Sequence, residues 1–219
     1  LGYQFTHDLS GSLAYRGSKV TLYNPSTDGV PALDDALGTS GLHGFQIGLT
    51  HDTRDNRFLA TEGHLIEAPF APVIGTYQYP RAELEARQYF MLRQHPDGSG
   101  RHVVSVGGRV GYTGDDTPIY DHFFAGGFST IRGFRYRGAS PIEYSTTSGM
   151  DVRVGGHFQL LASIEYMFPI TADDTLRGVV FCDTGTVEPN ISDWSDRYRV
   201  APGFGLRITI PMMGPAPIA

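Results

Sequence analysis

The 219-residue sequence has one cysteine, no long apolar run and no cluster of basic residues. A single cysteine, Cys182, excludes an internal disulfide framework. No stretch approaches the roughly 18 consecutive apolar residues of a membrane helix, although strands that cross a membrane hide their apolar residues in alternation. The net charge of -6, without any Lys/Arg-rich block, argues against nucleic acid as a partner.

What the chain does have is glycine and aromatic side chains, with 28 Gly, 12 Tyr and 13 Phe. Helical periodicity is nearly absent, and a period of two recurs instead. Together these features predict an all-β protein with many turns. The chain begins at Leu1 rather than at a methionine and ends at Ala219 within an apolar run. We therefore expect a fragment of a longer polypeptide.

Eight segments read as strands, and their connections differ in length. The predicted strands are residues 9–23, 41–50, 63–69, 79–92, 101–113, 155–168, 176–185 and 199–210. The links predicted as short turns are 51–62, 93–100 and 169–175, and those predicted as long loops are 24–40, 114–154 and 186–198. The 70–78 link falls on the long-loop side but is short. The pattern predicts an up-and-down antiparallel sheet with its long loops at one end.

Each predicted strand has one apolar face and one polar or small face. The sharpest case is 155–168, where Gln159, Ser163 and Glu165 alternate with Leu160 and Ile164. A soluble sandwich buries such an apolar face against a second sheet, whereas a membrane barrel turns it to lipid and keeps the polar face in the lumen. The pattern favours the barrel and leaves the sandwich open.

The segment from Tyr120 to Gly138 differs from the strands around it. Its glycines break regular pairing, because glycine reaches backbone angles that other residues avoid. Its aromatic residues indicate a loop packed against a surface. Arg132 lies in the middle, and a desolvated guanidinium without a carboxylate partner is costly. The sequence therefore predicts an acidic partner for Arg132.

Glu165 and Asp183 are the candidate partners. They lie on consecutive predicted strands, and pairing through the 169–175 turn places Glu165 roughly opposite 177–180, with Asp183 a little further from the turn. The weak alternation of 176–185 leaves the face of Asp183 open. A guanidinium between two carboxylates removes their repulsion, so Arg132 would hold the loop against the strands. The alternative is two solvated carboxylates on a wet face.

Other sites have weaker support. A carboxylate pair could serve general acid–base chemistry, as in glycosidases, but the only tryptophan, Trp194, offers no substrate platform. His51, Asp52 and Asp55 lie in a turn where side chains more often cap the backbone than bind metal. The glycines fit no phosphate-binding loop, the histidines lack zinc spacing, and Cys182 reads as a packed small residue. We expect no catalytic residue, metal or cofactor.

Five stretches resemble the BamA-type outer-membrane assembly superfamily, which includes TamA, the Sam and Toc barrels and two-partner secretion transporters. FFAGGFSTIRGF (123–134) is similar to its signature loop. The other stretches, in order, resemble its barrel strands and turns: GLTHDTRDNRFLATEGHLIEA (48–68), SIEYMFPI (163–170), VVFCDTGTV (179–187) and PGFGLRITIPMMGP (202–215). Leu59–Gly63 lacks the family's usual proline, so only that turn departs from the pattern.

The resemblance implies a sixteen-stranded transmembrane barrel preceded by POTRA repeats, with one long loop folded into the lumen. Residues 1–219 would be the C-terminal part of that barrel domain, about eight strands, with the inward loop at about 114–154 and without the POTRA repeats. Its arginine pairs with two strand acids. The residues that match this loop lock are Gly126, Gly127, Arg132, Gly133 and Phe134 in the loop, with Glu165 and Asp183 on the barrel wall.

The implied function is the folding and insertion of β-barrel proteins into the bacterial outer membrane, without bond chemistry. Its partners would be outer-membrane lipid, unfolded barrel clients and accessory assembly subunits. Clients would be admitted by pairing with a weak seam between the first and last strands. A two-partner secretion pore of the same superfamily and a soluble β-sheet hydrolase using the carboxylate pair are the alternatives.

Overall fold

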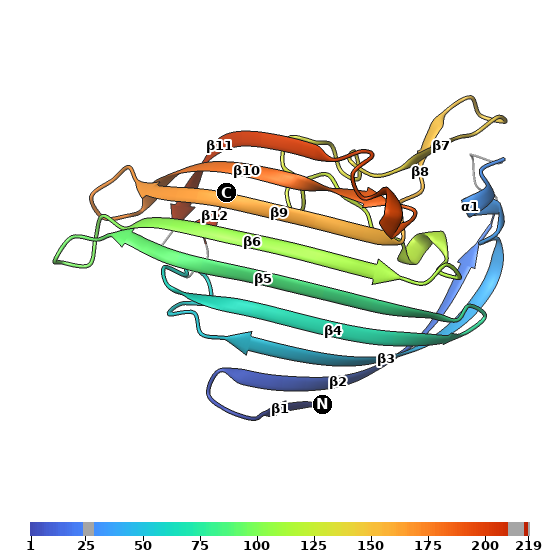
Figure 1. Ribbon diagram of the computed structural model, residues 1–219, viewed down its shortest axis with the longest axis horizontal. Helices are drawn as coiled ribbons and strands as arrows, with labels where there is room; N and C mark the ends of the chain where they lie inside the picture. Colours follow the sequence, from blue (N-terminus) through green and yellow to red (C-terminus); the bar gives the residue numbers. More distant parts are fainter. Residues whose placement is uncertain (24–28, 210–216, 219) are drawn as a thin grey trace.

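One curved antiparallel sheet dominates the computed structural model, which describes residues 1–23, 29–209 and 217–218. In that part of the chain the sheet has ten strands in the order β1-β2-β3-β4-β5-β6-β9-β10-β11-β12 (Figure 1). The long strands are β2 (Leu9–Leu22), β3 (Gly38–Asp52), β4 (Gly63–Gly75), β5 (Tyr79–Arg93), β6 (His102–Thr113), β9 (Phe158–Pro169), β10 (Leu176–Glu188) and β11 (Arg199–Thr209). The short outer strands are β1 (Gly2–Gln4) and β12 (Pro217–Ile218).

The connections at one end of the sheet carry the remaining elements. They are α1 (Pro31–Asp34), the 3-10 turns η1 (Ile119–Asp121) and η2 (Ile191–Asp193), and the hairpin of β7 (Ile142–Tyr144) and β8 (Asp151–Arg153). All lie at the right-hand end in Figure 1, whereas the opposite end has shorter turns. No helix in the described part of the chain is long and apolar enough to cross a membrane. The predicted up-and-down order with long loops at one end is confirmed.

The strands form because their side chains alternate between two unlike environments. In β9, Leu161, Glu165 and Met167 are buried on the concave face, whereas Ile164 and Tyr166 are exposed on the convex face. The same alternation runs across the sheet. Its exposed large apolar side chains on the convex face include Leu13, Phe45, Ile47, Leu49, Phe70, Ile74, Leu84, Phe90, Val106, Val110, Val180, Val200, Phe204 and Leu206.

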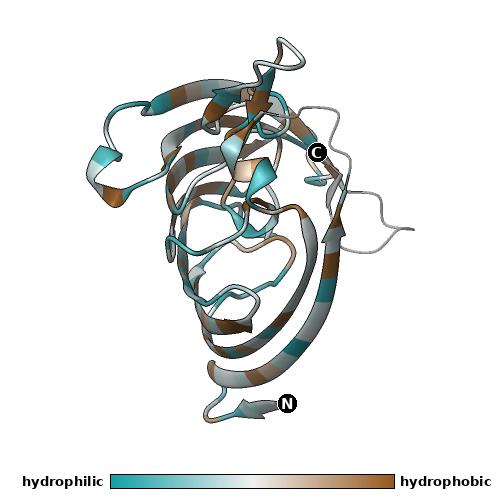
Figure 2. Ribbon diagram, turned by 90° about the vertical axis from the view of Figure 1, so that its right-hand side faces the viewer, coloured by the Kyte–Doolittle hydropathy of each residue, from teal (hydrophilic) through white to brown (hydrophobic). Residues whose placement is uncertain are grey.

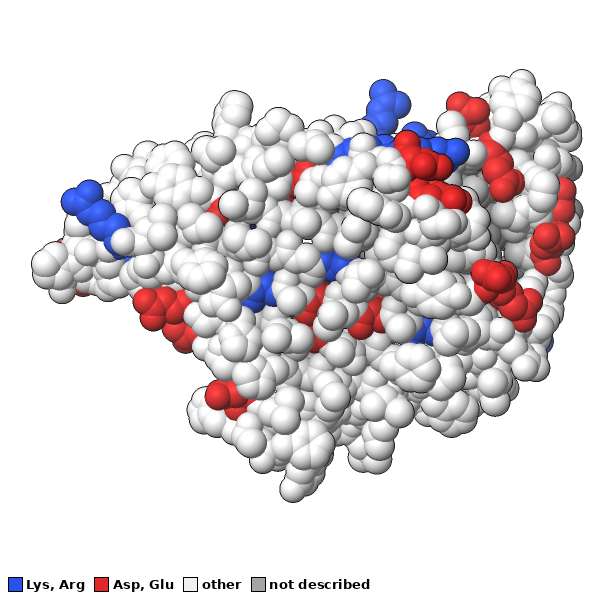
Figure 3. Space-filling model, in the orientation of Figure 1, with Lys and Arg blue, Asp and Glu red and all other residues white. Residues whose placement is uncertain are grey.

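The sheet curls into an open trough, seen end-on in Figure 2. Figure 3 shows its convex face, which is mostly uncharged, with acidic side chains gathered toward the long-loop end. No second sheet covers this apolar face in the part of the chain that the structure describes. A polar inner face and an apolar outer face are the arrangement of a transmembrane barrel rather than of a soluble sandwich.

Several strand ends differ from the prediction. β4 continues to Gly75, so the predicted 70–78 link shrinks to residues 76–78. The pairing with β5 continues through Pro72, which lies opposite Pro80. β3 begins at Gly38 inside the predicted 24–40 loop, and β10 continues to Glu188 inside the predicted 186–198 loop. The short strands β1 and β12 were not predicted.

The packed core lies between the wall of the trough and the long loop that joins β6 to β9. The largest cluster contains Phe123, Ala125, Ile131 and Ala139 from the loop, together with Leu161 and Val187 from the wall. A second cluster, around Val30, Ala36, Ile119 and Val154, joins α1 to the two ends of the loop. Packing therefore fixes the loop against the concave face at its tip and at its base.

Candidate functional site

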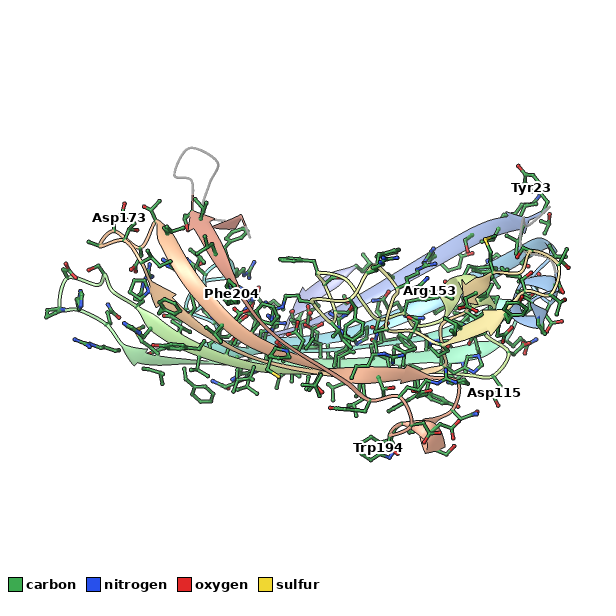
Figure 4. All side chains as sticks on the ribbon, turned by 90° about the horizontal axis from the view of Figure 1, so that it is seen from above. Tyr23, Asp115, Arg153, Asp173, Trp194 and Phe204 are labelled. Atoms are coloured by element: carbon green, nitrogen blue, oxygen red, sulfur yellow. The ribbon has the colours of Figure 1, made fainter. Side chains whose placement is uncertain are left out.

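The loop between β6 and β9 fills part of the trough. It leaves the sheet after Thr113, crosses the concave side and returns before Phe158. Its two ends are joined by a bridge between Phe123 and Gly156. Figure 4 shows the loop above the concave face, on the side where Arg153 is labelled. The connection between Thr113 and Phe158 therefore lies on the concave side of the sheet.

Histidines close the base of this loop. Nδ1 of His122 lies 2.7 Å from the carbonyl oxygen of Val154, and Nε2 lies 2.9 Å from that of Thr117. His157 places its Nε2 3.1 Å from the same His122 nitrogen. Burial, and then the charge of His122, lower the pKa of His157 below its ordinary value. These contacts join the segment that leaves β6 to the segment that leads into β9.

The tip of the loop is shaped by glycines. Gly126, Gly127 and Gly133 have φ angles of 109°, 104° and 89°, a region that side chains with a Cβ rarely adopt. The turn between them is closed by backbone bonds from Gly127 N to the Ile131 oxygen (3.2 Å) and from Thr130 N to the Gly127 oxygen (3.2 Å). The tip thereby turns Ile131 into the core, where its exposed fraction is 0%.

The next residue, Arg132, reaches the barrel wall. Its Nε and Nη2 donate to the two carboxylate oxygens of Asp183 at 2.7 Å each, and its backbone N–H donates to the same carboxylate at 3.0 Å. Its Nη1 donates to Oε2 of Glu165 at 2.8 Å. Asp183 is 1% exposed and Glu165 is 7% exposed. The guanidinium therefore bridges two buried carboxylates on adjacent strands, with bidentate geometry toward one of them.

The strand register explains why the two acids meet. Asp183 is paired with Ser163, and Glu165 with Phe181. Glu165 and Asp183 thus form a diagonal pair on one face, within reach of a single long side chain. The expectation that Glu165 lies opposite 177–180 is wrong by one position. In the 169–175 turn, both Ile170 N and Thr171 N donate to the Leu176 oxygen, which shifts the pairing.

Three contacts of this site were missed in the sequence. Ser163 donates its hydroxyl to Asp183 at 2.7 Å. Phe181 presents its ring to the guanidinium carbon of Arg132 at 3.5 Å, a cation–π contact. Arg207 of β11 places its Nη2 2.6 Å from Oε1 of Glu165. Arg207 alternates with Leu206 and Ile208 along β11, so it lies on the polar face, and the sheet order brings it to Glu165.

A glycine makes room for the ring that lies under Arg132. Gly203 is the cross-strand partner of Phe181. A Cβ built on Gly203 would lie 2.4 Å from Cζ of that ring, so any larger residue would displace it. The ring therefore occupies space that the missing side chain leaves free on the concave face.

We expect Arg207→Gln to lower the free energy of unfolding by about 1–2 kcal/mol, because Glu165 loses one of its two ion pairs and keeps the one with Arg132. Urea unfolding of the full-length protein in micelles measures the change. Arg199→Gln is the matched control, since Arg199 lies on the same strand, donates to the Arg197 oxygen and forms no ion pair within 4.0 Å among the described residues. Equal losses in both variants would show that Arg207 adds nothing to the site.

The aromatic residues of the loop only partly meet the expectation of packing. Phe123 is buried, and Phe134 packs partly against the core. Phe128 and Tyr136 are 73% and 76% exposed, so their predicted packing is wrong within this chain. Phe128 instead borders a cavity of about 270 Å³ together with Arg87 and Arg207 of the wall.

The Asp/Asn-rich turn at 53–62 caps its own backbone, as predicted. Asp55 accepts hydrogen bonds from Thr61 N at 2.8 Å and Glu62 N at 3.1 Å, and Asn56 accepts one from Phe58 N at 2.8 Å. Burial raises the pKa of Asp55, but these bonds outweigh burial and leave its pKa below the ordinary value. In the described part of the chain, no three His, Cys, Asp or Glu side chains are placed to hold a metal ion.

The whole sequence, residues 1–219, matches the Omp85 superfamily domain. The chain belongs to the Omp85 superfamily. It is 25% identical over 205 residues to an "Outer membrane protein assembly factor BamA" of Nitratidesulfovibrio vulgaris, covering 90% of this chain and 25% of that protein. It is 27% identical over 151 residues to the protein of the same name from Neisseria meningitidis serogroup B, covering 64% of this chain and 18% of that protein.

The fold of this Omp85 chain is similar to the crystal structure of BamA from Haemophilus ducreyi lacking POTRA domains 1-3. The TM-score is 0.75 at 19% identity, covering 96% of this chain and 47% of that one. The Omp85 chain spans about a quarter or less of the curated relatives it matches. Its antiparallel strands are thus part of an outer-membrane β-barrel, which confirms the predicted fold class and location.

Proposed function

We propose that this Omp85 chain is the loop-bearing part of the barrel of an outer-membrane protein assembly factor, which folds and inserts other β-barrel proteins. The observation that carries the proposal is Arg132, held by Glu165 and Asp183 on the concave face. The curated relatives are both named as assembly factors of this kind. POTRA repeats and the remaining strands would lie outside residues 1–219, which would form the C-terminal part of the barrel domain.

The contacts of Arg132 with Glu165 and Asp183 support a structural role for the site rather than a catalytic one. Asp183 accepts two guanidinium bonds, a backbone bond and a serine bond, and Glu165 accepts one guanidinium bond from Arg132 and forms an ion pair with Arg207. Neither carboxylate is free to take a proton from a substrate, as a general base must. The lock would instead keep the loop and three strands, β9, β10 and β11, in one rigid unit. No bond chemistry is needed for this role.

A rigid unit of the loop with β9, β10 and β11 would help the barrel to admit client strands at one place only. Client strands would be admitted by pairing with an edge of the barrel, and this requires one seam to open while the rest of the wall stays closed. The lock would confine opening to strands outside this unit. Outer-membrane lipid, unfolded barrel clients and accessory assembly subunits would be the partners.

A depletion experiment tests the proposal. The chromosomal copy of the full-length gene is shut off while Arg132→Ala or Arg135→Ala is supplied from a second copy. Arg135 is exposed, lies on the same loop and has no partner among the described ion pairs, so its variant is the matched control. We expect the amount of folded barrel proteins in the outer membrane to fall with Arg132→Ala and to stay at the parental value with Arg135→Ala.

Two outcomes would contradict the proposal. Unchanged amounts of every folded barrel protein, with the parental protein itself dispensable, would remove the assembly role. Loss of one secreted protein, with barrel proteins unaffected, would assign the chain to the two-partner secretion pores of the superfamily instead.

A further inference from the structure

The segment between β10 and β11 folds to the opposite side of the sheet from the inward loop. Figure 4 shows Trp194 beneath the convex face, whereas Arg153 lies above the concave face. In the end-on view of Figure 2, the same turn projects away from the interior of the trough. This connection therefore points outward, toward the side that carries the apolar side chains of the strands.

The outward segment presents apolar side chains that nothing in the described chain covers. Ile191, Trp194 and Tyr198 are 59%, 49% and 41% exposed. Trp194 and Tyr198 meet edge to face, with ring centroids 6.4 Å apart. The next outward residues, Val200 and Phe204 on β11, are exposed as well. The segment thus continues the apolar band of the barrel wall at its long-loop end.

The backbone of the segment is compact, and its net charge is small. Asp193 N donates to the Asn190 oxygen at 3.2 Å, and Asp196 N donates to the Asp193 oxygen at 2.9 Å. Residues 191–198 carry two acids, Asp193 and Asp196, and one base, Arg197, so their net charge is only −1. Attraction to the segment would therefore come from its apolar and aromatic surface rather than from charge.

We propose that residues 191–198 are an interfacial anchor, which inserts Trp194 between the headgroups and acyl chains of the leaflet at the long-loop end. Tryptophan and tyrosine favour this boundary, because their rings are apolar and their N–H or O–H groups still reach water. The occupant of the surface is lipid, and continuity with the lipid-facing strand residues is the reason. The proposal rests on the barrel lying in a membrane and not on its role in assembly.

Quenching of Trp194 fluorescence tests the anchor. The full-length protein and its Trp194→Phe variant are folded into phosphatidylcholine vesicles whose lipids carry bromine either near the headgroup or near the chain ends. Subtracting the variant's emission isolates Trp194 even where other tryptophans lie elsewhere in the protein. We expect its emission to shift to shorter wavelength on folding into vesicles. We also expect the headgroup-proximal bromine to quench it more strongly than the chain-end bromine.

A transplanted tryptophan supplies the control. Tyr144 lies on the β7–β8 hairpin, away from the convex face, and is 61% exposed. Tyr144→Trp in the Trp194→Phe background is expected to emit as a water-exposed ring, without quenching by either lipid. Each variant must migrate as a folded barrel in unheated gels.

Three results would overturn the anchor. Trp194 emission at the wavelength of a water-exposed ring would place the segment in solvent. Blue-shifted emission without quenching would mean that protein, not lipid, covers it. Equal quenching of Trp194 and the Tyr144→Trp control would show that the segment is no closer to lipid than other loops. None of these results depends on whether the protein assembles clients, so failure here is distinct from failure of the proposed function.

Discussion

Replacing Arg132 with alanine is expected to lower the free energy of unfolding by about 3–5 kcal/mol, because it leaves the buried Asp183 without its cation and Glu165 with one cation instead of two. Asp183 would lose two of its four hydrogen bonds and keep those from the backbone N–H of residue 132 and from Ser163, and Glu165 would keep only its ion pair with Arg207. Urea unfolding of the full-length protein in micelles, and the temperature at which unheated gels lose the folded band, measure the loss. Arg135→Ala is expected to unfold as the parent does.

A second variant separates the charge effect from the loss of packing. Adding Glu165→Gln and Asp183→Asn to Arg132→Ala removes both carboxylate charges that Arg132 had neutralised and is expected to restore part of the lost stability. If the triple variant is less stable than Arg132→Ala, the carboxylates stabilise the barrel in some way other than by binding Arg132. If Arg132→Ala unfolds at the parental urea concentration, the lock contributes nothing to stability.

Gly126→Ala is expected to cost about 2–5 kcal/mol, since it combines a forbidden backbone angle with a steric clash. The φ angle of Gly126 is 109°. A Cβ there would lie 2.5 Å from the Arg135 oxygen and 2.6 Å from Gly138 N. Those atoms belong to the backbone of the loop after its tip, so they cannot move away by a side-chain rotation. The tip would shift, and Arg132 would move off its two acids.

Gly127→Ala is the matched control, because it shares the strain but not the clash. Its φ angle is 104°, and the nearest atom to a built Cβ is the Tyr136 Cα at 3.5 Å. We expect a cost of about 1–3 kcal/mol from the backbone angle alone. Limited proteolysis within residues 123–139 reports whether the tip has left the wall. Cleavage of both variants at the same rate would argue that the close contacts of Gly126 do not hold the tip.

The strands and their two faces were predictable because each is encoded locally. In 155–168, Gln159, Ser163 and Glu165 alternate with apolar residues, with breaks only at Leu161 and Met167, and β9 buries Glu165 and exposes Ile164 as that pattern indicates. Strand ends were less predictable, since pairing with a neighbour decides them. Pro72 stays in β4 because Val73 and Phe70 on either side pair with β5. A sequence pattern carries no information about that neighbour.

The partners of Arg132 were likewise predictable in part from the sequence, and the strand register decided the rest. An arginine among glycines and aromatic residues indicated a buried charge, and the resemblance of the loop and of two later strands pointed to Glu165 and Asp183. The face of Asp183 remained open, because 176–185 alternates weakly. It was decided by the register, which pairs Asp183 with Ser163 and turns both toward Arg132.

The sequence by itself determined that this chain is an antiparallel sheet with one lipid-compatible face and a glycine-rich loop carrying a charge that needs a partner. Those properties reside in alternation, in turn residues and in a single motif, all short-range. Only the tertiary structure decided that Arg207 shares Glu165, that Gly203 makes room for the ring beneath Arg132, and that Trp194 points outward. These contacts join residues far apart in the chain, and they depend on strand register and sheet curvature.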